Sequence, residues 1–172
     1  QEAAQLTLNW FQKVDLQIDI KADGTEVTDA DLSAEEFIRT AIGKECPEDT
    51  VVGEEDSTTT GTSSRRWIID PIDGTASFVR GVPLYSSLLA MFDEYGPAIG
   101  LIHLPALGQS LLAGRGLGAI NNGKPARISS IKSIPESCIS SSSFDQPWWP
   151  DKPLRSILNS GAKTRTWGDG YG

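Results

Sequence analysis

The sequence has very little cysteine and histidine. Cys46 and Cys138 are its two cysteines and His103 is its one histidine. Neither cysteine stands in a CxxC or other metal-ligand spacing, which argues against a disulfide scaffold and against a zinc site. Sparse, unpaired cysteines are typical of a reducing compartment, so we expect a cytoplasmic protein.

Long apolar runs and excess basic charge are also missing. No apolar run approaches the roughly 18 residues of a membrane-spanning helix. Lysine and arginine number 15 against 23 acidic residues, which gives a formal net charge of -8. Nucleic acids and anionic membranes are polyanions that need a basic face, so neither is an expected partner. An acidic protein that handles phosphate must neutralise its ligand locally.

The two ends of the sequence suggest a fragment. The sequence begins at Gln1 without an initiating methionine and shows no signal peptide. It ends at residues 168–172, where a βα unit would still need its helix and next strand. The 172 residues suffice for one domain or for a domain and part of a second. We therefore expect a chain truncated at its C-terminus.

Hydrophobic periodicity predicts helices and strands in two groups. We expect a helix over 3–11, a second helix that begins near Asp29 with Thr28 or Asp29 as its N-cap, and a strand over 67–69. A hairpin over 84–92 and 98–103 follows, then strands over 110–113 and 118–120 and a turn at Asn122-Gly123. The Ser, Thr and Gly-rich segment 56–64 reads as a mobile surface loop.

The pattern of predicted helices and strands changes near residue 133. A strand over 138–142, a helix over 153–159 and a strand over 162–167 alternate as in an α/β domain. We predict an N-terminal α+β domain over 1–133 and an incomplete α/β domain over 134–172.

Two aspartates stand three residues apart in Asp70-Pro71-Ile72-Asp73-Gly74-Thr75, directly after the strand that ends at Ile69. Pro71 restricts the turn, Gly74 lets the backbone approach a ligand, and the Ile72 carbonyl offers a further oxygen. A helix that begins near Thr75 would direct free N–H groups at an anion. The pattern therefore suits a cation and a phosphate side by side, although an isolated Asp-x-x-Asp-Gly more often only caps a helix.

A second acidic pair, Gly53-Glu54-Glu55, also follows a short β-like segment. If Glu54, Asp70 and Asp73 converge within about 4 Å, each like-charge pair costs about 4 kcal/mol at an effective dielectric constant near 20. Such convergence requires bound cations. Hard oxygen ligands suit Mg²⁺ or Mn²⁺.

Three motifs, in this order along the chain, resemble those of the inositol monophosphatase superfamily. They are residues 27–31 (Val-Thr-Asp-Ala-Asp), residues 53–55 and residues 67–75. Residues 78–83, 100–107 and 165–171 are more similar to its histidinol-phosphate phosphatase branch. The resemblance runs through nearly the whole chain. It implies a layered αβαβα sandwich with an incomplete second domain.

The resemblance also implies a reaction, the Mg²⁺-dependent hydrolysis of a phosphate monoester. Two or three ions, with Mn²⁺ as a substitute, would activate water for in-line attack. In the branch the substrate is L-histidinol phosphate, from histidine biosynthesis. The implied metal ligands are Glu54, Asp70, Asp73 and the Ile72 carbonyl. Glu54, Thr75 and Asp31 would act in catalysis, and phosphate and substrate would contact Asp73, Gly74, Thr75, Arg80 and Asp169.

Several roles stay open at this point. Glu55 is either a partner of a metal ligand or a loop acid. Arg80 meets an anion or caps local carbonyls, and Asp169 faces the substrate or stabilises the last turn. His103, within a Leu and Ile segment, is expected to be structural. Trp148, Trp149 and the serines over 140–143 are expected to be packing and strand residues.

Alternatives to a histidinol-phosphate phosphatase are also open. In the family a Trp-Asp pair and an acidic Glu-Ala-Gly-Gly segment lie downstream of the positions that match 168–172, and this chain has no counterpart. A non-catalytic metal-binding or interaction module is thus a second interpretation. Within the enzyme class, inositol or another sugar phosphate is the alternative substrate. The resemblance further implies a small phosphorylated metabolite as partner and a homodimer.

Overall fold

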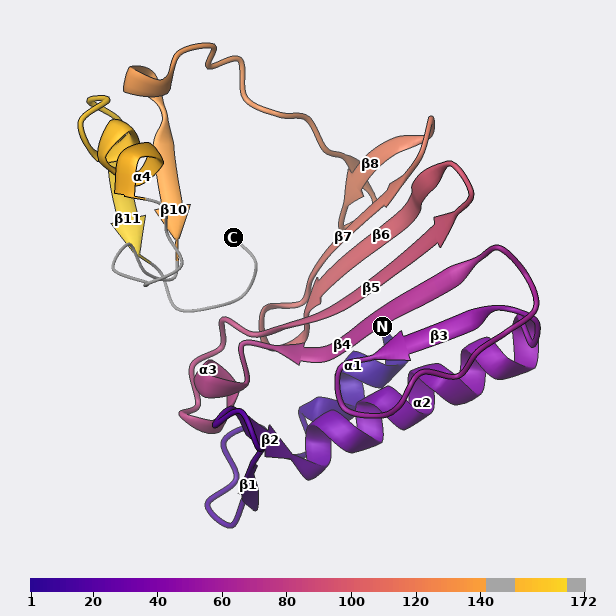
Figure 1. Cartoon of the computed structure of the whole chain (residues 1–172). Coiled ribbons are helices and arrows are strands. Elements are labelled where there is room, and N and C mark those ends of the chain that lie inside the picture. The colour runs from indigo at the N-terminus through magenta and orange to yellow at the C-terminus, as the bar shows by residue number, and fades with distance from the viewer. Residues whose placement is uncertain (142–150, 167–172) are drawn as a thin grey trace.

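A seven-stranded mixed sheet forms the centre of the protein (Figure 1). The computed structural model describes residues 1–141 and 151–166. The strand order is β3-β4-β5-β6-β7-β8-β9, in which β3 and β4 run parallel and every later pair is antiparallel. Helices α1 and α2 cover the β3 and β4 end of the sheet. The mixed sheet with helices against it fits the predicted layered αβαβα class.

Most elements follow the predicted order, but the first helix ends at Thr7 and does not reach residue 11, and an antiparallel strand pair within 18–28 was not predicted. The strands are β1 (Ile18–Ile20), β2 (Glu26–Thr28), β3 (Thr50–Gly53), β4 (Arg66–Asp73), β5 (Ser86–Asp93), β6 (Gly96–Leu104), β7 (Gln109–Gly114), β8 (Gly118–Asn121), β9 (Lys124–Pro125), β10 (Cys138–Ser141) and β11 (Lys163–Thr166). The helices are α1 (Glu2–Thr7), α2 (Asp29–Glu45), α3 (Thr75–Val79) and α4 (Asp151–Leu158), with short 3-10 turns at Pro105–Leu107 and Ile134–Glu136. The predicted hairpins are confirmed. Asn122 and Gly123 have positive φ, as a tight turn requires.

Helix α2 begins with a capping box. Thr28 is the N-cap, and its side chain accepts a hydrogen bond from the Ala30 N–H while the Asp31 carboxylate accepts one from the Thr28 N–H at 2.8 Å. The reciprocal bonds satisfy donors that the first turn of a helix leaves unpaired. The predicted start of this helix is confirmed, and its N-terminal end is fixed beside β2.

Two hydrophobic clusters join the helices to the sheet. One gathers Phe11, Phe78 and Tyr85, whose ring centroids lie 4.9–5.7 Å apart, around Ala30 and Ile72. The other packs α2 on β3 and β4 through Ile42, Val51 and Ile69. Because Phe78 and Tyr85 are fully buried, the first cluster holds α3 and the end of β4 against α2.

A buried carboxylate anchors the loop between β3 and β4. Asp49 accepts hydrogen bonds from Ser63 Oγ at 2.7 Å, Arg65 Nε at 3.0 Å and Trp67 Nε1 at 2.9 Å. Thr59 also forms an antiparallel bridge with Val51. The segment 56–64 is thus a surface loop, as predicted, but hydrogen bonds tie it to the sheet at both ends; its mobility stays a prediction.

A separate β-α-β unit follows the large sheet. Strands β10 and β11 pair in parallel, and α4 connects them. The alternation predicted for this part of the chain is confirmed. The domain boundary near residue 133 stays a prediction. Among the described helices, none combines the length and apolar character that crossing a membrane requires.

We expect Asp49→Asn to destabilise the protein by about 1–3 kcal/mol at pH 7, because charge-assisted hydrogen bonds are lost at a buried site. Burial alone would raise the pKa of Asp49, but the bonds from Ser63, Trp67 and Arg65 outweigh it and lower the pKa. A carboxylate with a lowered pKa contributes stability above its unfolded pKa near 3.9, and this is lost as the pH falls through the folded pKa. Urea unfolding of both proteins should therefore give curves that approach each other below about pH 4.

The exposed neighbour Glu48 provides the matched control, Glu48→Gln, which should unfold like the wild type. A difference between wild type and Asp49→Asn that persists undiminished in acid would contradict this assignment.

Candidate metal and phosphate site

The parallel pairing of β3 with β4 brings two acidic residues together. Gly53 pairs with Ile69, and these are the last residues in register. Glu54 and Asp70 each follow directly, at the same edge, because parallel strands present their carboxyl ends together. The sequence motifs 53–55 and 70–75 are therefore neighbours in space.

A β-bulge adds Asp73 to this edge. The pairing of β4 with β5 shifts between Asp70, opposite Leu88, and Asp73, opposite Ser86. Residues three apart in a regular strand face opposite sides, so the extra residue of a bulge is what allows both aspartates to act on one point. Ser86 Oγ donates to Asp73 Oδ2 at 3.1 Å, and Ser87 Oγ donates to the Pro71 carbonyl at 2.6 Å.

Asp70 experiences strong repulsion in this position. Burial, followed by the negative charges of Glu54 and Asp73, raises the pKa of Asp70 to about 8. Its carboxyl group is therefore largely protonated at neutral pH when no cation is present, and it shares a hydrogen bond with Glu54. Its Oδ1 atom is buried without a hydrogen-bond partner.

Lys21, from the turn between β1 and β2, supplies positive charge. Its Nζ atom lies 3.0 Å from Glu54 Oε1 and 2.7 Å from Glu55 Oε2. Burial would lower the pKa of Lys21, but hydrogen bonds and charge from Glu55 and Glu54 raise it. The side chain of Glu55 is 3% exposed, and burial raises its pKa despite Lys21. Glu55 is thus a buried acid paired with Lys21, and its role as a partner of a metal ligand stays a prediction.

Asp31 lies at the start of α2, fully buried. Its Oδ2 atom accepts hydrogen bonds from the Thr28 N–H and from Thr28 Oγ1 at 2.6 Å, whereas Oδ1 has no partner. Burial raises the pKa of Asp31, and the charge of Glu54 adds to this effect. Asp31 therefore interacts electrostatically with Glu54, one of the three residues Glu54, Asp70 and Asp73 that form the acidic edge of the sheet. The catalytic role of Asp31 stays a prediction.

Gly74 and Thr75 form the turn from β4 into α3. Gly74 is the N-cap residue at φ 86°, a left-handed conformation that favours glycine. The Thr75 hydroxyl donates to the Ile72 carbonyl at 3.0 Å. This bond occupies one lone pair of the carbonyl and leaves the hydroxyl oxygen able to accept from a water molecule.

Arg80 borders a cavity of about 480 Å³ beside this turn. Its guanidinium donates to Glu26 Oε2 and to the Ala76 carbonyl, both at 2.8 Å. The predicted capping role is therefore observed, together with an ion pair that the sequence did not indicate. The cavity is lined by Gly24, Thr25, Glu26, Glu54, Gly74, Thr75 and Arg80 among others, so Glu54 is the residue of the acidic edge that borders it.

The remaining predicted residues lie elsewhere. His103 is buried in β6 with Nδ1 at 3.2 Å from Ser110 Oγ, and burial lowers its pKa, in agreement with a structural role. Asp169, Trp148, Trp149, Ser142 and Ser143 fall outside the described residues. Ser140 and Ser141 are strand residues of β10, as expected.

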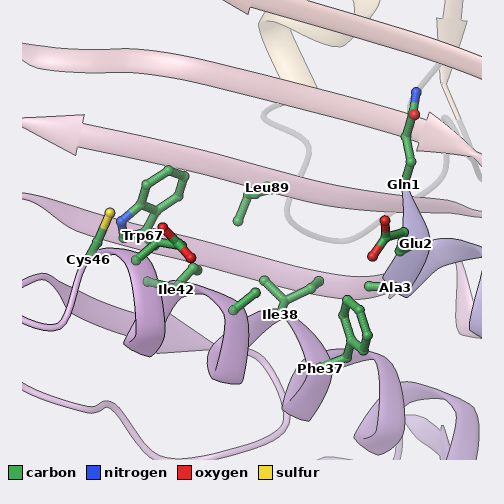
Figure 2. Close-up of a pocket in the computed structure, with 11 residues that line it drawn as sticks. Gln1, Glu2, Ala3, Phe37, Ile38, Ile42, Cys46, Trp67 and Leu89 are labelled. Carbon is green, nitrogen blue, oxygen red and sulfur yellow. The ribbon is translucent and has the colours of Figure 1, made fainter.

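A second cavity of about 480 Å³ lies between the helices and the sheet (Figure 2). It is lined mainly by apolar side chains, including Phe37, Ile38, Ile42, Trp67 and Leu89. A phosphate group would lose its hydration there without gaining ionic partners, so this cavity does not suit the predicted substrate.

The acidic edge fits a hard divalent cation by its chemistry. Its donors are carboxylate and carbonyl oxygens, and Asp70 Oδ1 is a buried acceptor without a partner. In the described part of the chain no three acidic, imidazole or thiol groups are already gathered around one point. Glu54 is instead turned to Lys21 and Asp73 to Ser86. The individual ligand roles stay a prediction.

Sequence reasoning missed Lys21 as a member of the site. Lys21 is 33 residues from Glu54 along the chain, and no spacing rule connects them. The only signal was the excess of acid in the motifs, which requires a cation of some kind nearby.

The fold and the acidic edge together define a layered α/β protein with carboxylate and carbonyl oxygens that suit a hard cation. The inositol monophosphatase family matches residues 1–169, so the chain belongs to this family. A histidinol-phosphatase from Chlorobaculum parvum is 40% identical over all of this chain and 67% of its own length. One from Mycobacterium tuberculosis is 39% identical over 97% of this chain and 67% of its own length. The chain thus spans about two thirds of the length of these relatives.

A solved structure, the IMPase from Thermotoga maritima, superposes with a TM-score of 0.83. It is 31% identical and covers 98% of this chain and 65% of its own. The family and these relatives place the chain among the phosphoric monoester hydrolases, and the fold neighbour confirms the predicted fold class.

We expect Lys21→Met to tighten Mg²⁺ binding about three- to tenfold, because the ammonium group both repels the ion and occupies Glu54 and Glu55. Isothermal titration calorimetry of the metal-free protein measures this directly. The exposed Lys132→Met is the control and should leave the affinity unchanged. Equal or weaker binding by Lys21→Met would mean that Lys21 does not compete with the metal.

Proposed function

We propose that the protein acts in Mg²⁺-dependent hydrolysis of L-histidinol phosphate to L-histidinol and phosphate. The observation that carries the proposal is the 40% identity with a histidinol-phosphatase along the entire chain. The acidic edge supports the metal requirement, since it combines oxygen donors with an unpartnered buried carboxylate atom. The substrate, the metal and the activity of the 172-residue chain are all part of the proposal.

Glu54, Asp70, Asp73 and the Ile72 carbonyl would hold the metal. When bound, Mg²⁺ supplies Lewis-acid chemistry that neutralises charge on phosphate oxygens and makes water more nucleophilic. Asp70 would have to lose its proton to take part, because its pKa of about 8 keeps it largely neutral otherwise. Mn²⁺ has similar ligand preferences and could replace Mg²⁺.

The chain's own polar groups would orient water and substrate. The Thr75 hydroxyl donates a hydrogen bond to the Ile72 carbonyl, so its oxygen is left to accept a hydrogen bond from the attacking water. Asp31 Oδ1, buried and unpartnered, can accept from the same water network. Gly74 allows close approach of the phosphate, and Arg80 offers charge at the border of the cavity once Glu26 releases it. We also propose that Asp169 contacts the substrate, as the family resemblance implies.

A second candidate within the enzyme class is an inositol or sugar phosphate phosphatase. The favouring observation is the 31% identity with the Thermotoga maritima IMPase over 98% of the chain. This is lower than the identity with the histidinol-phosphatases, so we place it second. The proposed function also includes a cytoplasmic location, which rests on cysteine usage, and a homodimer, which rests on the family resemblance.

Phosphate release decides between the substrates. We expect Mg²⁺-dependent release from L-histidinol phosphate to exceed release from inositol monophosphate by at least about tenfold. The assay uses the 172-residue chain and a version extended through the downstream reading frame to the length of the relatives. Asp73→Asn should abolish turnover, because a ligand is lost while an oxygen remains for Ser86.

The control for Asp73→Asn is Asp29→Asn, an exposed carboxylate in the first turn of α2. A preference for inositol monophosphate would support the second candidate. Full turnover by Asp73→Asn would refute the metal assignment, and silence from both chain lengths would favour a non-catalytic metal-binding module.

A further inference from the structure

Glu35 and Arg39 form a buried ion pair on the face of α2 that meets the end of β3. Arg39 Nε donates to Glu35 Oε1 at 2.7 Å, and the two side chains are 14% and 2% exposed. A carboxylate so deeply buried is costly unless all its acceptor sites are used. The contacts that use them lie on the loop that carries the acidic residues.

The Glu35 carboxylate binds the backbone of that loop. Oε2 accepts from the Glu55 N–H at 2.9 Å, and Oε1 accepts from the Asp56 N–H at 3.1 Å. Arg39 also binds this loop, because it donates hydrogen bonds to the Asp56 carbonyl at 3.1 Å and to Thr59 Oγ1 at 3.3 Å. Donor and acceptor groups of the same loop backbone are thus held from one side.

Gly53 makes this approach possible. A Cβ atom at this position would lie 1.9 Å from Glu35 Oε1 and 2.5 Å from an Arg39 nitrogen. Any larger residue would therefore have to push the ends of both side chains away from the loop that they bind. The glycine of the Gly53-Glu54-Glu55 motif is therefore explained by Glu35 rather than by a turn.

The contacts from Glu35 and Arg39 hold a segment whose acidic side chains are repelled by neighbouring acids. Glu54 is joined by its own peptide bond to the Glu55 nitrogen that Glu35 binds. It must stay beside Asp70 and Glu55 although their like charges repel. Because Arg39 balances the charge of Glu35, the pair fixes the backbone without adding negative charge to the acidic edge.

We propose that Glu35 and Arg39 are a positioning pair that sets the proposed metal ligand Glu54 through the backbone of residues 55 and 56. This inference rests on the proposed function of the site. Neither side chain is assigned to the metal or the substrate. Loss of the pair should weaken metal binding and leave the chemistry intact once metal is saturating.

The test measures Mg²⁺ affinity by calorimetry and kcat at saturating Mg²⁺, at a temperature where circular dichroism shows each variant folded. Glu35→Gln replaces one acceptor by a donor that faces the Glu55 N–H, so we expect Mg²⁺ affinity to fall about 10- to 100-fold. High Mg²⁺ should restore most of kcat. Arg39→Lys keeps the charge but loses the bonds to Asp56 and Thr59, and should give a smaller loss even if Glu35→Gln fails to fold.

Glu36→Gln is the matched control, since Glu36 is the exposed neighbour of Glu35. A double-mutant cycle separates positioning from general destabilisation: in a Glu54→Gln background, Glu35→Gln should have little further effect on Mg²⁺ affinity.

Unchanged Mg²⁺ affinity in folded Glu35→Gln and Arg39→Lys, with turnover in the wild type, overturns the positioning role and leaves the proposed function standing. Mg²⁺ binding without hydrolysis by any form refutes the proposed function, while the affinities still decide the role of the pair. A wild type that binds no Mg²⁺ overturns both.

Discussion

The mutual repulsion of acidic side chains at the edge of β3 and β4 is the constraint on which the rest of the structure depends. Strand pairing and a bulge place Glu54, Asp70 and Asp73 near one another, and the burial of Asp70 weakens the screening of its charge, while Glu54 stays partly exposed. Without a metal cation, a proton on Asp70 and the ammonium group of Lys21 neutralise part of this negative charge. A divalent ion can displace the proton from Asp70 and the ammonium group of Lys21 from Glu54, because both neutralise the acidic side chains more weakly than the ion would.

The scaffold around this edge resists that repulsion. The aromatic cluster of Phe11, Phe78 and Tyr85 fixes α3 and the end of β4, and the Asp49 hydrogen bonds fix the far end of the loop between β3 and β4. The Glu35 and Arg39 pair fixes the near end. A loop held at both ends by buried groups loses little further conformational entropy when its ligands are engaged. Fixed loop ends of this kind are what a precise ligand set requires.

Local pattern was enough to predict most elements and the acidic motifs. Helix α2 with its cap at Thr28, the hairpin of β5 and β6, and the turn at Asn122-Gly123 depend on neighbouring residues, and sequence periodicity reports these. The contacts of Lys21 and Glu35 with the loop after β3 could not be assigned in this way, because those partners lie 20 to 34 residues away along the chain. An acid at position 35, beside buried Ala34 on the packed face of α2, was the one local sign of a buried partner.

The central claim is that this acidic edge binds a divalent cation, and calorimetric titration of Mg²⁺ into the 172-residue chain and into Asp70→Asn tests it most directly. Because asparagine resembles the protonated Asp70 that prevails without metal, the variant should fold and melt at least as well as the wild type when metal is absent. The account predicts saturable binding to the wild type that is lost in Asp70→Asn. Equal binding by the two proteins, or none by the wild type, would contradict it.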